Sequence, residues 1–80
     1  MPLAFVLVNV QIGSEREVLE ALKKIDGVER AYVVYGVYDI VAKVKAESMD
    51  ELREIVTYKI RRLDKVQSTQ TMRVYEEAPS

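Results

Sequence analysis

One pattern occurs twice in this chain, and it restricts the possible folds more than any other feature. Each half contains a β-rich segment, then Ser-x-x-Glu, then an amphipathic helical stretch. The helical stretches end in related sequences, Lys23-Lys24-Ile25-Asp26-Gly27-Val28 and Arg61-Arg62-Leu63-Asp64-Lys65-Val66, and each leads into another β-rich segment. The repeat therefore predicts two consecutive β-α-β units.

Local signals set the expected boundaries of these units. We expect strands over 3–10, 28–35, 39–46 and 67–76, and helices over 14–26 and 48–63. The run from Leu3 to Val8 is apolar at every position, which predicts a strand buried on both faces. Ser14 with Glu17, and Ser48 with Glu51, have the spacing of a capping box. Each predicted helix therefore has a start signal of its own.

Each predicted helix also has one apolar face for packing. The faces consist of Val18, Leu19, Leu22 and Ile25 in the first helix and of Leu52, Val56, Ile60 and Leu63 in the second. On the outer side of the first helix, Glu20 and Lys24 have the i,i+4 spacing of an ion pair. Gly27 is expected to end this helix in a left-handed conformation.

This order of elements predicts an α+β, ferredoxin-like domain that spans residues 1–80. Right-handed crossovers would place both helices on one face of a four-stranded antiparallel sheet. The other face would then be open, although the first strand is apolar on both sides and Tyr32, Val34 and Val41 are further apolar candidates for it. Because so apolar a face is unfavourable in water, we expect a dimer formed through the open sheet face.

Composition excludes several classes of function. The 80 residues include no cysteine and no histidine, so we expect no disulfide, no metal site and no cofactor. Twelve basic and thirteen acidic residues give a net charge of −1, which argues against direct nucleic-acid binding. No apolar run reaches the roughly 20 residues of a membrane span, so we expect a cytoplasmic protein without a membrane partner. The 31% charged content with a single Asn suggests a thermophilic source.

Two polar segments stand out against this apolar and charged background. Gly36 and Asp39 lie in the turn between the second and third predicted strands, and Ser68, Thr69 and Thr71 open the last strand. Asp39 has two interpretations, as a turn-capping carboxylate or as a group that holds a ligand ammonium. Gly36 is expected to allow a positive φ or a close backbone approach. Thr69 and Thr71 are two positions apart and so share one face of a strand.

Three segments together resemble the effector-binding domain of Lrp/AsnC-type transcription regulators, called the RAM domain. They are Tyr35-Gly36-Val37-Tyr38-Asp39, the predicted helix from Ser48 to Leu63, and Val66-Gln67-Ser68-Thr69-Gln70-Thr71. In that family the domain is ferredoxin-like, dimerises sheet to sheet and assembles into rings, often octamers. The resemblance implies that amino acids or related metabolites bind between dimers.

The resemblance also implies a ligand-binding set of residues. It would consist of Gly36, Tyr38 and Asp39 from one subunit and Ser68, Thr69 and Thr71 from a neighbour. Full-length regulators have a winged helix-turn-helix before this domain, whereas here Met1 comes directly before the first strand. We therefore expect a stand-alone effector-binding module that lacks the DNA-binding domain and mixes with full-length Lrp/AsnC paralogues. If the sequence is instead a domain excised from a longer regulator, that regulator could bind DNA.

Two other functions remain open at the level of sequence. Some ferredoxin-like dimers are cofactor-free enzymes of the dimeric α/β-barrel type, in which Asp39 or Tyr38 would serve as the acid–base group. The chain would otherwise be an assembly partner that binds no ligand. Buried carboxylates around a deep pocket within one dimer would favour the enzyme, and a polar cleft between dimers would favour the sensor. We expect the sensor and no enzymatic activity.

Overall fold

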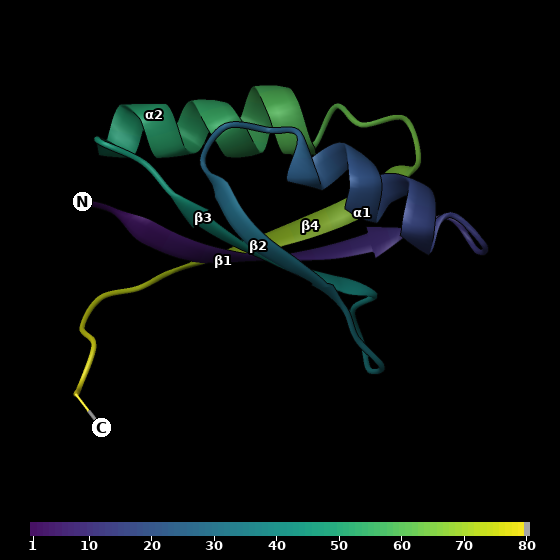
Figure 1. Cartoon of the computed structure of the whole chain (residues 1–80), viewed down its shortest axis with the longest axis horizontal. Helices are drawn as coiled ribbons and strands as arrows, with labels where there is room; N and C mark the ends of the chain where they lie inside the picture. The colour runs from purple at the N-terminus through teal and green to yellow at the C-terminus, as the bar shows by residue number, and fades with distance from the viewer. Residues whose placement is uncertain (80) are drawn as a thin grey trace.

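A computed structural model describes residues 1–79 and confirms the ferredoxin-like fold. Its elements are β1 (Leu3–Val10), α1 (Glu15–Lys23), β2 (Val28–Val33), β3 (Ile40–Lys45), α2 (Met49–Glu54), η1 (Ile55–Ile60) and β4 (Val66–Arg73) (Figure 1). The strands form one sheet in the order β2-β3-β1-β4, and each neighbouring pair is antiparallel. β1 and β3 are therefore the central strands, as two interleaved β-α-β units require.

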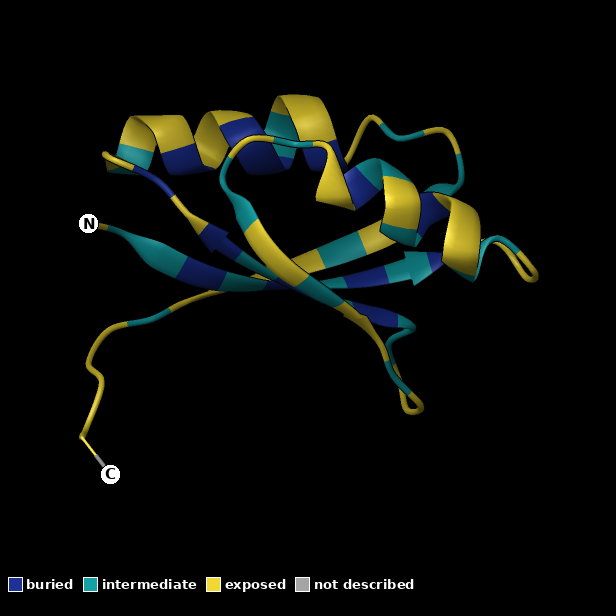
Figure 2. Cartoon of the chain, viewed as in Figure 1, coloured by how far each residue is buried: buried dark blue, intermediate teal, exposed yellow. Residues whose placement is uncertain are grey.

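The helices cover a single face of the sheet, and the core lies between the two layers. In β1, residues at even positions are buried and residues at odd positions are partly exposed. The helices turn their buried sides toward the sheet (Figure 2). The buried core consists of Ala4, Val6, Val8, Val10, Val18, Leu22, Ile40, Ala42, Val44, Ala46, Leu52, Ile55, Val56 and Ile60. The predicted apolar helix faces contribute most of its helical part.

The first helix differs from its prediction at both ends. Ser14 is the N-cap residue, but its side chain makes no capping hydrogen bond, so the first predicted capping box is wrong. Its φ of −103° and ψ of 10° differ from the extended conformation that lets an N-cap side chain reach the next turn. The last helical residue is Lys23, so the helix is shorter than 14–26. Lys23, and not Lys24, pairs with Glu20, at 3.5 Å.

Gly27 lies in the turn that follows α1 and does not cap the helix directly. Its φ is +101°, and a Cβ there would lie 2.6 Å from Ile55 Cδ1 and 3.2 Å from the carbonyl oxygen of Lys45. Both the backbone angle and the close approach of its neighbours therefore require glycine. Through this contact the end of the first helix packs against the middle of the second.

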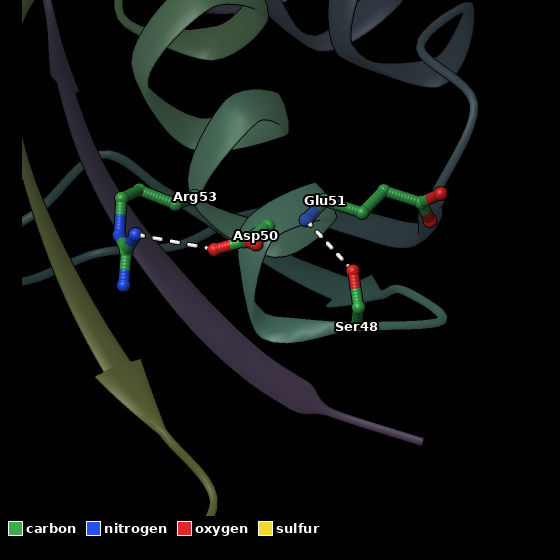
Figure 3. A network of polar contacts seen from close by, with 4 residues as sticks. All are labelled: Ser48, Asp50, Glu51 and Arg53. Atoms are coloured by element: carbon green, nitrogen blue, oxygen red, sulfur yellow. Dashed lines mark hydrogen bonds and ion pairs between the residues drawn. The ribbon is translucent and has the colours of Figure 1, made fainter.

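The second helix begins as the sequence predicts. Ser48 has φ −147° and ψ 164°, and its Oγ accepts a hydrogen bond of 3.1 Å from the Glu51 amide (Figure 3). The Glu51 carboxylate reaches back one residue further than in a capping box and accepts from the Glu47 amide at 3.1 Å. Asp50 and Arg53 form an exposed contact of 3.4 Å on the outer side of the same turn. The cap holds α2 to the end of β3.

The predicted helix 48–63 is not α-helical throughout. After Glu54 the chain continues as a π-helix, η1, and the Arg61 amide donates to the Val56 carbonyl oxygen at 2.9 Å. A π-helix has more residues per turn than an α-helix and is rare. Its wider turn lets the adjacent residues Ile55 and Val56 both be buried, although the sequence pattern placed only Val56 in the core.

The face of the sheet opposite the helices combines apolar and charged side chains. In the strand register, Phe5 lies between Lys43 and Met72, and Leu7 lies between Val41 and Gln70. The register also places Tyr32 opposite Val41 on this open face. Val34 lies beyond the end of β2 and instead lines a cleft described below. Within residues 1–79, every helix is too short or too polar to cross a bilayer.

Candidate functional site

The turn between β2 and β3 forms the first part of the candidate site. It projects away from the helices, beyond the ends of β2 and β3 (Figure 1). The Val34 amide donates to the Asp39 carbonyl oxygen at 2.9 Å, and the Asp39 amide donates to the Val8 carbonyl oxygen at 3.0 Å. Gly36 has a positive φ of 158°, one of its two expected properties, whereas a Cβ there would meet no atom within 4 Å, so the alternative of a close backbone approach is not found in this subunit. The tip of the turn is fully accessible to a ligand or another subunit.

Asp39 connects this turn to the end of β1. Its Oδ2 accepts a hydrogen bond of 2.9 Å from the Val10 amide, which is 29 positions away in the chain. The turn-capping interpretation anticipated a bond to a nearby amide, so the carboxylate instead joins two strands. Among residues 1–79, Asp39 Oδ1 accepts no hydrogen bond. One carboxylate oxygen is therefore fixed, and the other remains available to a ligand.

Tyr38 connects the same turn to β4. Its hydroxyl donates a 2.7 Å hydrogen bond to Gln70 Oε1. β1 lies between β3 and β4, which are therefore about 10 Å apart, so the two side chains together must reach across β1. Gln70 is opposite Leu7 on the open face of the sheet, and the bond consequently lies on that face. Tyr38 belongs to the surface through which dimerisation was predicted.

The three hydroxyl residues of β4 divide between the two faces of the sheet. Ser68 is opposite Asn9 on the open face, and Asn9 Nδ2 donates to Ser68 Oγ at 3.4 Å. Thr69 is opposite Val8 and Thr71 is opposite Val6, both of which are buried under the helices. Thr69 and Thr71 therefore share the helix-covered face of the sheet. No single surface of one subunit contains all three.

Two clefts are each lined by one residue of the predicted ligand-binding set. The Asp39 cleft, of about 430 Å³, lies beside the start of α1 and the end of β2 and is lined by Gly13, Glu15, Arg16, Leu19, Val33, Val34, Tyr35 and Asp39. The arginine cleft, of about 270 Å³, lies between the second helix and β4 and is lined by Met49, Leu52, Arg53, Val56, Thr57, Arg61, Thr71 and Arg73. β2 and β4 are the two edges of the sheet, so these clefts lie at opposite sides of the domain.

Sequence reasoning did not identify Gln70 or the three arginines as neighbours of the predicted site. Gln70 had a usable signal, because it is two positions from Ser68 and so lies on the same face of β4. Arg53, Arg61 and Arg73 come from three different elements, and no spacing in the sequence relates them. Only the packing of the second helix on the sheet brings these residues to one cleft.

Comparison with known proteins gives the family. The model of the Lrp/AsnC ligand binding domain matches residues 3–79. The chain belongs to the Lrp/AsnC family. It is 39% identical over 72 residues to an uncharacterised HTH-type transcriptional regulator of Pyrococcus furiosus, which covers 86% of this chain and 48% of that protein. It is 38% identical over 58 residues to the regulatory protein AsnC of Escherichia coli, which covers 72% of this chain and 38% of AsnC. This family member thus spans about half or less of the length of these curated relatives.

Three solved structures that resemble this chain support the fold. A Thermus thermophilus protein, TTHA0845, has a TM-score of 0.94 with 32% identity, and the two chains cover each other completely. A Pyrococcus horikoshii protein, PHS023, has a TM-score of 0.89 with 42% identity over 96% of this chain and 93% of that one. A Neisseria meningitidis transcriptional regulator, solved as a complex with L-Met, has a TM-score of 0.87 with 20% identity over 99% of this chain and 53% of that one, a likeness of fold alone. The ferredoxin-like architecture is common to all three.

Proposed function

We propose that this Lrp/AsnC domain is a non-enzymatic module that binds an amino-acid effector and assembles into oligomers. The proposed ligand site consists of Gly36, Tyr38 and Asp39 from one subunit and Ser68, Thr69 and Thr71 from a neighbour. The observation that carries this proposal is the Asp39 carboxylate, which lines a cleft with Oδ1 available while Oδ2 is held by the Val10 amide. A carboxylate fixed in this way is prepared to bind an ammonium group by a charge-assisted hydrogen bond.

The proposed assembly starts from the open face of the sheet. Phe5, Leu7, Val41 and Tyr32 give this face an apolar centre, which a second copy would remove from water. Dimers formed in this way would join into a ring, with an octamer as the expected size, and the ligand would bind between dimers. Asp39 and Thr71 lie in clefts at opposite sides of one subunit, which supports a site shared by subunits, since a small ligand cannot reach both within one subunit.

Effector binding regulates such an assembly through differential affinity. A ligand that contacts two subunits binds the assembled state more tightly and therefore stabilises that state. The protein partners of this module would include full-length Lrp/AsnC paralogues, whose effector-binding domains share this fold. The module would then act on transcription through the paralogue and without contacting DNA itself.

The test compares Asp39→Asn with the wild-type protein in a thermal-shift screen of the twenty amino acids. Asparagine keeps an oxygen for the Val10 amide but loses the charge that would hold the ligand ammonium. We expect at least one amino acid to raise Tm of the wild-type protein, and this rise to disappear in Asp39→Asn. Asp64→Asn, an equal change of charge at an exposed turn position, serves as the control. Ultracentrifugation of the wild-type protein with the same amino acid should reveal a larger oligomer.

A retained Tm response in Asp39→Asn would remove Asp39 from the site. No response of the wild-type protein to any amino acid would overturn the proposed function and favour an assembly partner without a ligand.

A further inference from the structure

The arginine cleft has a charge that the proposed site does not explain. Arg53, Arg61 and Arg73 line it together with Thr71, a member of the proposed ligand set, and no acidic residue is in the lining. The buried side chains of Leu52 and Val56 form an apolar part of its wall. Three guanidinium groups that border one cleft give it a positive potential, which an anionic group would complement. The cleft therefore has the chemistry of an anion site with room for a short apolar chain.

Two of these arginines lack a carboxylate partner within the described part of the chain. Arg53 pairs with Asp50 at 3.4 Å, on the exposed side of the helix. Across residues 1–79, Arg61 and Arg73 form no ion pair within 4.0 Å. Arg61 directly follows η1, where the helix dipole gives a cation a small stabilisation. Arg73 also borders a cleft that contains Glu76 and Glu77, but neither carboxylate lies within that distance.

The Asp39 cleft has the opposite charge. Its lining includes two carboxylates, of Glu15 and Asp39, and one guanidinium group, of Arg16. Because the two clefts lie at opposite edges of the sheet, a ligand that touches both must bind between two subunits. Such a ligand would meet one cleft with a net negative lining and one cleft with a positive lining. A molecule with one cationic group and more than one anionic group complements that combination.

We propose that the effector is an amino acid with a carboxylate side chain, an inference that rests on the proposed function. Asp39 of one subunit holds the ammonium, while the turn amides and β4 hydroxyls bind the α-carboxylate. Arg61 and Arg73 of the neighbouring subunit bind the side-chain carboxylate, for which the planar guanidinium group offers bidentate hydrogen bonds. The methylene groups of the ligand pack against the apolar wall of the arginine cleft. A volume of about 270 Å³ suits a small ligand of this kind.

Isothermal titration calorimetry with two matched pairs of ligands tests this inference. L-glutamate is compared with L-glutamine, and L-aspartate with L-asparagine, so that only the charge of the side chain changes. We expect at least one acid to bind about tenfold to a hundredfold more tightly than its amide, the range for a charge-assisted hydrogen bond. The double variant Arg61→Gln/Arg73→Gln should lose this preference and keep its affinity for the amide. Both arginines are exposed, so the variant is expected to fold.

Arg62→Gln is the matched control for this experiment. It removes the same charge one position from Arg61, but the Arg62 guanidinium lies 5.2 Å from the centre of the Tyr58 ring and is not in the cleft lining. The preference for acids should persist in this variant. Equal or tighter binding of the amides by the wild-type protein overturns the inference and leaves the proposed function intact. Equal losses for acid and amide in the double variant also overturn it, and binding of no amino acid overturns both.

Discussion

The same backbone turn follows the helical segment in both halves of the domain. The first half consists of β1, α1 and β2, and the second of β3, α2, η1 and β4. In each half, two consecutive amide-to-carbonyl hydrogen bonds lead from the helix into the next strand. The matching bonds run from Ile25 to Leu22 and from Val28 to Ile25 in the first half, and from Leu63 to Ile60 and from Val66 to Leu63 in the second, each at 3.1 Å. The internal repeat in the sequence is thus a repeat of backbone geometry.

The same turn also connects each half to the other. The Lys45 amide donates to the Gly27 carbonyl oxygen at 2.8 Å, and the Gln11 amide donates to the Lys65 carbonyl oxygen at 2.9 Å. Both donors lie three positions before the N-cap serine of their own half. A strand of each half is thus hydrogen-bonded beside the edge strand of the other half, β3 beside β2 and β1 beside β4. This pairing explains why the two units form a single domain.

The halves differ in how tightly this turn is packed. Gly27 has a positive φ and is in contact with Ile55, whereas the equivalent Lys65 has no positive φ. Thirteen positions separate Ser14 from Gly27, and seventeen separate Ser48 from Lys65, so the second helical segment is longer. The start of its π-helical part, at Ile55, packs against Gly27 in the turn that follows the first helix. The extra length of one half is thus accommodated by a small residue in the other.

The largest expected effects come from the equivalent core positions Leu22 and Ile60, both fully buried. Leu22→Ala and Ile60→Ala should each lower the free energy of unfolding by about 2–5 kcal/mol, because each leaves a cavity. Urea unfolding at one fixed protein concentration measures both. Ile12→Ala, at a fully exposed position, should change the value by less than about 0.5 kcal/mol. A small effect at only one of the two core positions would break the equivalence of the halves.

Gly27→Ala should have the next largest effect on the free energy of unfolding. The matched change in the second half should have a much smaller effect. Forcing a side chain into a positive-φ conformation costs about 1–3 kcal/mol, and the new Cβ also meets Ile55 Cδ1. Lys65→Ala, the matched change in the second half, should remain within about 0.5 kcal/mol of wild type. Adding Ile55→Val removes Cδ1, so the cost of Gly27→Ala should fall in that background. Additive costs in this double-mutant cycle would show that the contact with Ile55 does not contribute to the requirement for glycine.

The smallest expected difference concerns the two N-cap serines. Ser48→Ala removes a side-chain cap and should lower the free energy of unfolding by about 1 kcal/mol. Ser14→Ala removes no capping hydrogen bond and should have no measurable effect. Thermal and urea unfolding of the two single variants check this contrast. Equal destabilisation by both variants would mean that Ser14 adopts the extended cap conformation in solution.

The sequence predicted the features that depend on local periodicity. The order of the elements and the Ser48 cap follow from alternation, helical spacing and a capping signal. The predicted burial of β1 on both faces is not found within one subunit, because its odd-numbered residues stay partly exposed. Ser14 carries the same capping signal as Ser48, but its backbone conformation is not the extended one that a side-chain cap needs. The π-helix had no comparable local signal in the sequence.

The candidate site was predictable only in part, because its groups come from separate elements. The β2–β3 turn and the start of β4 were identifiable as polar segments between apolar strands. The bond from the Val10 amide to Asp39 and the bond from Tyr38 to Gln70 each depend on the pairing of distant strands. The grouping of Arg61 and Arg73 also requires the helix to pack on the sheet. Whether the proposed ligand residues meet between subunits stays a prediction for the binding experiments.

The central position of β1 has a consequence for synthesis of the chain. Residues 3–10 are translated before the rest of the sheet, yet Leu3 pairs with Lys45 and Ala4 pairs with Arg73. The nascent chain therefore carries an apolar strand with both edges open until β3 has been made, and with one edge open until β4 has been made. Such a segment is prone to associate with other unfinished chains. We expect a ribosome-associated chaperone to increase the soluble yield of this protein, and to do so by binding Leu3–Val10.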